Sequence, residues 1–516
     1  MRLLINSAIA LAASLSLAVP AHAAWYEAKS KHFVVYANEP PDELRGFAEK
    51  LERFDQAVRY VRNMSDPDLT DSERIRVYEL PGLEAVGRLA RNSDVAGFYE
   101  QRASGSAAFV PHSVGMDDAG SLTTDEIFFH EYAHHLQLQD SSIAMPEWVR
   151  EGFAEFFATA KISADGSVII GNPPQYRSDA LFYFNKDLTL EQMLGGTYKT
   201  LDPVNEDVLY AEGWLLTHYL TFNDSRKGQL GRYVDGIQGG KSALDSAKAA
   251  FGDLTALDHE LEQYKLVRFT AVRIDGKILH VGTIALRQLR PGEAAIMDVH
   301  IRSTRGVGSK AAQGLAADAR KIAASYPGDP FVQSCLAEAD YDAADYSGAS
   351  AAADRALSVD PSDIDALIYK GRAEMALAQL DPAHANWPTV RSWFLKANKV
   401  DSENAAALQL FYQSFLAAGQ PPTTNADDAL LYAVRLAPLD QDVRLLAVRQ
   451  LLTENRLSDA REMIEPMAYE PHTSSTWRQI SARILDSIIS GNSKSALASV
   501  EQALSYSRLL QEKGLD

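Results

Sequence analysis

The chain contains very little cysteine, with Cys335 alone among 516 residues. One thiol cannot close an intramolecular disulfide, so the hydrophobic core has to hold the fold without one. Basic residues are also scarce: 50 Lys and Arg stand against 69 Asp and Glu, which gives a formal net charge of -19. This charge argues against nucleic acid as a partner, because polyanions bind basic surfaces.

Long hydrophobic runs are missing after the first twenty residues, so we expect no membrane span in the mature protein. The N-terminus is the exception. Met1-Arg2 is weakly basic, Leu3 to Val19 is apolar, and Ala21-His22-Ala23 is a small-residue cleavage site. This order predicts a secretory signal peptide over residues 1–23 and a periplasmic or secreted protein.

A short motif in the first half, His130-Glu131-Tyr132-Ala133-His134, has the form H-E-x-x-H. On a helix, His130 and His134 share one face, so both imidazoles can reach one metal ion. Glu131 lies about 100° further round the helix, beside the metal, where a general base belongs. His135 lies off this face and is interpreted as a surface or packing residue. Thr123 to Glu126 fits a capping box and predicts where the helix begins.

A catalytic zinc needs three protein ligands, and Glu151 is the candidate for the third. Pro146 can open a second helix over residues 147–159. Glu155 shares a face with Glu151 and would accept the spare ring N–H of a ligand histidine. Gly152, which has no side chain, would let the two helices approach closely.

The segments HEYAHH and WVREGFAEFF resemble the gluzincin metalloproteases, the thermolysin-like group, and are most similar to its peptidase-MA-like branch. The resemblance implies an α+β zincin-like catalytic domain in which His130, His134 and Glu151 bind Zn²⁺. It also implies that Glu131 is the general base for peptide hydrolysis by a water that zinc activates, and that Glu155 supports a ligand histidine. The G-x-M-E-N element of related aminopeptidases is missing, which favours an endopeptidase.

The same resemblance implies an oxyanion donor on the aromatic-rich helix expected over residues 208–220. Tyr210 matches the family position better than His218, which is the alternative donor. Such a hydrogen bond can lower the barrier by a few kcal/mol. Packing in the core is the competing interpretation of both side chains.

The region before the motif predicts a small sheet. Strands are expected at 31–36, 75–80 and 107–110, with an amphipathic helix over 41–62. The resemblance to gluzincins implies that the edge strand of this sheet pairs with extended substrate, and we expect Ser104 to Val110 to form that edge, or a plain structural edge.

Residues 268–307 alternate like strands, at 270–274, 277–281 and 294–301, and Asp275-Gly276 predicts a hairpin turn. They predict a β-rich connecting segment. His280 and His300 within it are isolated and are interpreted as unrelated to zinc.

From residue 308 the sequence is rich in alanine and repeats. Pro327 and Pro361 are 34 positions apart, the period of tetratricopeptide (TPR) repeats, each a pair of antiparallel helices. The pattern restarts near 400–404 and 437–440 at longer intervals. Such a solenoid offers a concave surface that could bind a protein or peptide partner, or it could simply shield and steady the protease domain.

The sequence thus predicts a signal peptide at 1–23, a metallopeptidase domain at 24–260, a β-rich segment at 261–307 and TPR-like repeats at 308–516. Two other functions remain open: a catalytically inactive TPR scaffold, and a zinc hydrolase of non-peptide amides. Intact Glu131 argues against the first, because an inactive relic has no need of a base.

Overall fold

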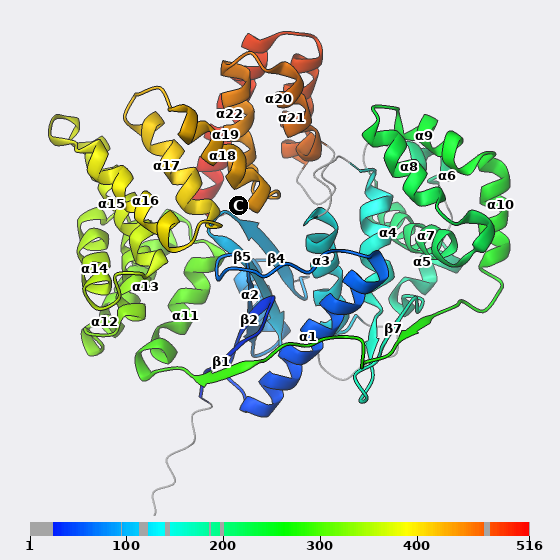
Figure 1. Cartoon of the computed structure of the whole chain (residues 1–516), viewed down its shortest axis with the longest axis horizontal. Coiled ribbons are helices and arrows are strands. Elements are labelled where there is room, and N and C mark those ends of the chain that lie inside the picture. The colour runs from blue at the N-terminus through cyan, green and yellow to red at the C-terminus, as the bar shows by residue number, and fades with distance from the viewer. Residues whose placement is uncertain are drawn as a thin grey trace, which may run out of the picture.

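The computed structural model describes residues 24–93, 95–112, 122–139, 145–184, 187–196, 201–468 and 475–514. The predicted signal peptide lies outside these residues. A central sheet lies between a helical lobe containing α4 to α10 and a helical array containing α11 to α22 (Figure 1). Within the described ranges, each helix is too short or too polar to cross a bilayer.

The central sheet has six strands in the order β4-β5-β3-β2-β1-β9. Its strands are β1 Tyr26–Lys29, β2 Phe33–Ala37, β3 Ile75–Leu80, β4 Phe98–Arg102, β5 Gly105–Pro111 and β9 Ala285–Gln288. Three of the four inner strands, β2, β3 and β5, are parallel, with Tyr36 opposite Tyr78 and Val77 opposite Ala108. Their carboxyl ends therefore meet at one edge of the sheet.

The prediction that Ser104 to Val110 form an edge strand is wrong. β5 contains most of the predicted segment and pairs on both sides, with β3 and with β4. The edge strand on that side of the sheet is β4, Phe98–Arg102. Its sequence FYEQR has no apolar alternation beyond the first two residues, so periodicity alone could not reveal it.

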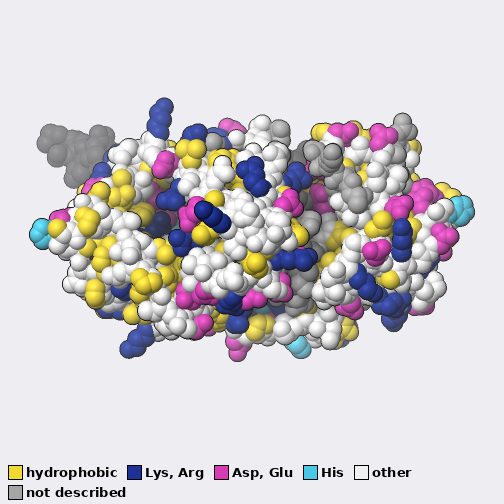
Figure 2. Space-filling model, turned by 90° about the horizontal axis from the view of Figure 1, so that it is seen from above, with side chains coloured by type: hydrophobic (Ala, Val, Ile, Leu, Met, Phe, Trp, Pro, Cys, Tyr) yellow, Lys and Arg dark blue, Asp and Glu magenta, His cyan; other side chains and the backbone are white. Residues whose placement is uncertain are grey.

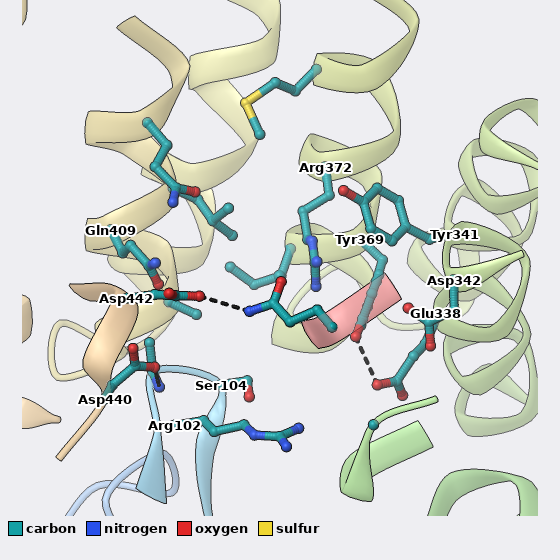
Figure 3. Close-up of a pocket in the computed structure, with 18 of the residues that line it drawn as sticks. Arg102, Ser104, Glu338, Tyr341, Asp342, Tyr369, Arg372, Gln409, Asp440 and Asp442 are labelled. Atoms are coloured by element: carbon teal, nitrogen blue, oxygen red, sulfur yellow. Dashed lines mark hydrogen bonds between the residues drawn. The ribbon is translucent and has the colours of Figure 1, made fainter. Parts of the chain in front are cut away.

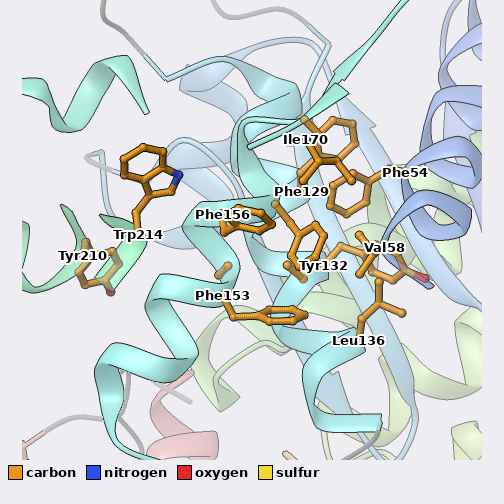
Figure 4. Close-up of a cluster of buried hydrophobic side chains, with 14 of the residues drawn as sticks. Phe54, Val58, Phe129, Tyr132, Leu136, Phe153, Phe156, Ile170, Tyr210 and Trp214 are labelled. Atoms are coloured by element: carbon orange, nitrogen blue, oxygen red, sulfur yellow. The ribbon is translucent and has the colours of Figure 1, made fainter. Parts of the chain in front are cut away.

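Helix α1, Pro41–Arg62, and strand β3, Ile75–Leu80, have the bounds that the sequence predicts. α1 packs against α3, Thr124–Gln139, which carries the H-E-x-x-H motif, and against α4, Glu147–Ala158, which carries Glu151. Phe54 of α1 stacks on Phe129 of α3 with ring centroids 4.0 Å apart (Figure 4). The hydrophobic core therefore fixes the motif helix from behind.

The helical lobe completes the N-terminal half. Helix α2, Leu83–Ala90, lies beside the central sheet. After α4, the elements of the lobe are β6 Lys161–Ile162, β7 Val168–Ile170, η1 Gln175–Arg177, α5 Ser178–Phe182, α6 Leu190–Gly195, α7 Pro203–Phe222, η2 Asp224–Arg226, α8 Gln229–Gln238, α9 Ala243–Phe251 and α10 Leu254–Tyr264. α7 packs on α4 at a very short distance, since a Cβ on Gly152 would lie 2.3 Å from the carbonyl oxygen of Gly213. Gly152 thus permits close approach to α7, not to the other motif helix as predicted.

The predicted β-rich segment is confirmed only in part, because the strand expected at 270–274 is present as β8, Val272–Ile274, whereas residues 277–281 lie in a turn and a loop. β8, Val272–Ile274, pairs with β7 of the helical lobe, and β9 pairs with β1 of the central sheet. The stretch 294–301 belongs to helix α11, Pro291–Arg305. Pro291 at the first helical position and Glu293, whose carboxylate accepts from the Arg290 backbone N–H, start this helix.

The C-terminal half is a TPR-like array of antiparallel helices. It comprises α11 Pro291–Arg305, α12 Ser309–Ser325, α13 Pro330–Asp342, α14 Tyr346–Val359, α15 Ile364–Leu380, η3 Pro382–His384, α16 Trp387–Val400, α17 Ala405–Ala417, α18 Thr424–Leu436, α19 Gln441–Thr453, α20 Leu457–Ala468, α21 Ser475–Ile489 and α22 Ser493–Lys513. Pro327 and Pro361 lie in the turns before α13 and α15, as the 34-residue spacing predicts. The later turns at 401–404 and 437–440 also fall where the sequence restarts.

The array curls until its two ends meet. A Cβ on Gly308, just before α12, would lie 2.5 Å from the backbone carbon of Lys513 at the end of α22. Arg91, which follows α2, donates to the carbonyl oxygen of Gly306 over 3.2 Å. The helices therefore form a closed ring whose junction rests on the N-terminal half.

Candidate metal centre

The helix that carries the H-E-x-x-H motif begins as predicted. The backbone N–H of Thr123 donates to Glu126 Oε2 over 2.9 Å, and the Glu126 N–H donates to Thr123 Oγ1 over 3.2 Å. This capping box satisfies amide groups that the first turn leaves unpaired. It fixes where α3 begins, and His130 and His134 lie on the side of α3 that faces Glu151 of α4.

Three donor atoms from the two helices converge. His130 Nε2 and His134 Nε2 are 3.2 Å apart, and Glu151 Oε2 is 3.4 Å from each. Ligand atoms held about 2.0–2.1 Å from a tetrahedral zinc lie about 3.3–3.4 Å from one another. The three side chains thus fit zinc in donor chemistry and in spacing.

The surroundings of the three donors favour a cation. Burial lowers the pKa of His130, but the bond to Glu151 and the charges of Glu155 and Glu131 outweigh it and raise that pKa. Glu151 is fully buried, whereas Glu131 is partly exposed. Glu131 can therefore reach a substrate that enters from solvent, while Glu151 cannot.

Glu155 lies close to the cluster but is held by other groups. Its Oε1 is 3.7 Å from His130 Nδ1, longer than a hydrogen bond. Tyr176 Oη donates to Glu155 Oε2 over 2.6 Å, and Arg177 Nη2 donates to Oε1 over 2.9 Å. Glu155 therefore acts on His130 through its charge, and its hydrogen bonds fix the loop that carries Tyr176 and Arg177.

Nothing in the sequence indicates that Tyr176 and Arg177 lie beside Glu155. They follow a Pro-Pro loop, more than twenty residues from Glu155, and no helical or strand spacing links them to the motif. Arg177 also pairs with Asp207 of α7 and lies over the ring of Tyr210, 4.6 Å from its centroid. It therefore connects α4 and α7 beside the cluster.

Tyr210 lies at the cluster, as predicted. Its ring is nearly parallel to that of His130, with centroids 6.1 Å apart, and it is 7% exposed. Burial and the charge of Glu151 raise the pKa of Tyr210, so the phenol keeps its proton in neutral solution. It is therefore a hydrogen-bond donor next to the three metal-ligand candidates.

The alternative donor His218 does not fit this role. Its Nε2 lies 2.8 Å from the carbonyl oxygen of Thr270, and its Nδ1 lies 3.0 Å from the hydroxyl of Tyr264. The first contact takes the ring N–H of a neutral imidazole, and burial lowers the pKa of His218 to about 4. No proton is left for an oxyanion, so this prediction is corrected.

His135 is a packing residue, one of the two interpretations that the sequence left open. It is buried, and its Nδ1 lies 2.7 Å from the hydroxyl of Tyr99 on the edge strand β4. Burial lowers the pKa of His135 to about 3, so the imidazole is neutral and accepts from or donates to the phenol. This contact ties β4 to the motif helix.

A second feature is a cavity of about 780 Å³ inside the helical ring. The turn between β4 and β5 forms one wall, with Arg102 and Ser104 facing Glu338, Tyr369 and other side chains of the array (Figure 3). The walls carry charges of both signs and several amides: Arg76, Arg102, Arg372, Arg449, Arg508, Glu338, Asp342, Asp365, Asp440, Asp442, Glu501, Gln409, Gln413 and Gln511. On the face seen in Figure 2, acidic and basic side chains are likewise interspersed.

No protein-family model matches the chain, and no curated protein matches its sequence. Similar solved structures include PilF of Pseudomonas aeruginosa, 16% identical with a TM-score of 0.31, over 43% of this chain and 95% of that one. They also include Tom70 of yeast, 11% identical with a TM-score of 0.26, over 73% of this chain and 75% of that one. Both TM-scores are below 0.5, so neither neighbour shows the fold of this chain, and the antiparallel helices α11 to α22 themselves define the helical repeat array.

Proposed function

We propose that the chain is a zinc-dependent metallopeptidase of the gluzincin type, and that it acts as an endopeptidase. One observation carries the proposal. The donor atoms of His130, His134 and Glu151 are 3.2 to 3.4 Å apart, the spacing that tetrahedral zinc requires. The proposed periplasmic or secreted location rests on residues 1–23, which lie outside the described residues.

The residues around the donors support hydrolysis. Bound zinc would supply a Lewis acid and would make an attacking water more acidic. Glu131, next to the donors and partly exposed, takes the proton from that water and returns it to the leaving amine. Tyr210 donates to the oxygen that becomes negative as the scissile carbonyl is attacked.

The first experiment measures metal in the purified mature protein by elemental analysis, for wild type and for His134→Ala. Removal of an imidazole ligand should lower the zinc content by about one equivalent per chain. His280→Ala is the matched control, because His280 is an exposed histidine outside the cluster. Zinc that is missing from wild type, or a zinc content that His134→Ala does not lower, contradicts the proposal.

The second experiment separates the base from the ligands. Glu131→Gln should keep zinc at the cluster and lose turnover of unfolded protein substrates by about 10²–10⁴-fold, the usual contribution of a general base. Hydrolysis of simple amides without hydrolysis of proteins would instead indicate a non-peptide amidase. Zinc-loaded wild type that cleaves neither substrate would leave binding as the function.

A binding scaffold is the second candidate, and the cavity in the ring favours it. The guanidinium of Arg372 lies over the rings of Tyr341 and Tyr369, 4.3 and 5.1 Å from their centroids, on the cavity wall. Charged and amide side chains of this kind can pair with the backbone and side chains of a peptide segment. Arg372→Met should weaken binding of peptides from an immobilised array while leaving zinc content unchanged, and unchanged binding would count against this candidate.

A further inference from the structure

A second group of metal-ligand side chains lies at the edge of the central sheet where the parallel strands β2, β3 and β5 end. Glu39 follows β2, Glu79 is the fifth residue of β3, and His112 follows β5. The His112 N–H donates to the carbonyl oxygen of Leu80 over 2.7 Å, which fixes the position of His112 beside the end of β3. Strand register thus brings the three side chains together although they come from distant parts of the sequence.

The donor atoms are close enough to share one ion. His112 Nδ1 lies 2.9 Å from Glu39 Oε2 and 2.8 Å from Glu79 Oε1, and the three ligand atoms all lie within 4.8 Å of one another. A single Nδ1–H cannot point at both carboxylates. Ligands at right angles around a divalent ion, each about 2.0–2.2 Å from it, lie about 2.8–3.1 Å apart.

The two carboxylates are buried and incompletely bonded. The side chains of Glu39 and Glu79 are 7% and 6% exposed. Their other oxygens, Glu39 Oε1 and Glu79 Oε2, are buried without a hydrogen-bond partner. Buried carboxylate oxygens need a proton, a donor or a cation.

Positive charge is scarce around this pair. Among the described residues, His112 is the sole group that forms an ion pair with Glu39 or Glu79, and Glu43 of α1 adds a further negative charge. The site therefore gains from any divalent cation that can reach it, and His112, with 47% of its side chain exposed, lies between the carboxylates and solvent.

A comparable group elsewhere lacks these properties. His32, Asp55 and Asp66 also lie close together, but Arg59 donates twice to Asp55, and Lys31 pairs with Asp66. Those carboxylates already have cationic partners. The group around His32 is therefore an internal ion-pair network, whereas the group around His112 needs an added cation.

We propose that Glu39, Glu79 and His112 form a second binding site for a divalent transition-metal cation of the zinc or manganese type. The donor set of one imidazole and two carboxylates suits these ions, and exposure of His112 gives them access. This site differs from the proposed hydrolytic centre in its residues and in the elements that supply them. A bound ion would fasten together the ends of three parallel strands.

The test uses the full mature chain with His130→Ala and His134→Ala, so that the first cluster is disabled. This double variant should bind one equivalent of Zn²⁺ by elemental analysis, and Mn²⁺ should compete, measured by the paramagnetic resonance signal of free Mn²⁺. Adding Glu79→Gln should weaken zinc binding by at least about 100-fold, since loss of even an outer partner of a ligand costs 10–100-fold. The matched control is Glu84→Gln, which changes an exposed glutamate on α2.

A second measurement guards against misfolding. Zinc should raise the Tm of the double variant, because a ligand that binds the folded state stabilises that state. Zinc should not change the Tm of the triple variant that also carries Glu79→Gln. Without metal, Glu79→Gln should still unfold cooperatively, because glutamine keeps an oxygen that can accept from His112 Nδ1 and because the substitution removes one of two repelling buried charges. Absence of zinc binding in the double variant, or binding that Glu79→Gln does not weaken, would overturn the proposal, whatever wild type shows at the first cluster.

Discussion

Tyr210 and Tyr219 lie on the same helix, and their hydroxyl groups have different surroundings. Tyr210 stacks beside His130, whereas the Tyr219 hydroxyl donates to Glu260 over 2.8 Å. We expect Tyr210→Phe to lower kcat by about 10²–10³-fold without loss of zinc, because it removes one oxyanion donor. Tyr219→Phe is the matched control and should leave turnover unchanged; equal kcat values for the two variants would rule out the donor role. Steady-state kinetics and metal analysis make the comparison.

At this scale, spacing along one helix was the reliable guide. The i,i+4 separation placed His130 beside His134, and Glu151 could be predicted because it lies on the next helix. Arg177 could not, because it lies in a loop and reaches Glu155 through tertiary contacts alone. His218 was a chemically reasonable donor, but its bonds to Thr270 and Tyr264 could be known only from the fold.

The contact of α4 with α7 depends on two glycines. A Cβ on Gly152 would lie 2.3 Å from the Gly213 carbonyl oxygen, which is backbone and cannot rotate away. Gly152→Ala should therefore destabilise the protein by about 1–3 kcal/mol or more. Gly46→Ala in α1 has open space around its Cβ and should stabilise by about 0.5–1 kcal/mol. Urea unfolding of both variants checks the opposite signs, and a neutral Gly152→Ala would contradict the close packing.

A buried ion-pair network holds α1 to β2. His32 Nδ1 lies 2.8 Å from Glu52, and its Nε2 lies 3.0 Å from Asp66. Burial lowers the pKa of His32, but the bond to Glu52 and the charge of Asp55 outweigh it, so the pKa is raised. The folded protein therefore holds the proton more tightly than the unfolded chain. This contribution to stability is complete below about pH 6.5 and is lost as pH rises through the raised pKa.

The His32 network gives a pH-dependent prediction. The free energy of unfolding lost in His32→Gln should be larger at about pH 6 than at about pH 9, because only the protonated imidazole satisfies both neighbouring carboxylates. Urea denaturation of wild type and variant at both pH values measures the difference. A loss that does not change with pH would mean that His32 acts through packing alone.

Elements with long periodic patterns were predicted closely, as α1 and α4 show, whereas short apolar runs were not. Residues 294–301 read AAIMDVHI and suggested a strand, yet they lie in α11. A run of this length fits a strand or a buried helix equally well. Pro291 and Glu293, which are typical of the first turn of a helix, indicate the helix and not the strand.

The N-terminal half and the ring are joined at Asp440. One carboxylate oxygen accepts from the Val443 N–H and caps α19, while the other accepts from the Ala103 N–H over 2.7 Å. Asp440→Asn should keep the cap but replace the second acceptor by an NH₂ group, at a cost of about 1–3 kcal/mol. Hydrogen exchange at the β4–β5 turn should accelerate.

The control for Asp440 is Asp253→Asn, which changes the exposed N-cap of α10. There a single oxygen accepts from both Thr255 and Ala256, so an asparagine can replace it at little cost. Equal protection of the turn in the two variants would mean that Asp440 does not join the halves. The 34-residue period predicted the helix pairs, but nothing in it indicated this junction, which depends on residues more than three hundred positions apart.

Closure of the ring limits how this chain can change in evolution. An open solenoid can gain or lose a repeat, because each unit contacts only its neighbours and the ends face solvent. Here the carbonyl of Gly306 binds Arg91, and Gly308 touches Lys513. One more helix pair would separate Gly308 from Lys513, and one fewer would make them collide. We therefore expect homologous rings to vary in sequence and loop length while the number of helix pairs stays constant.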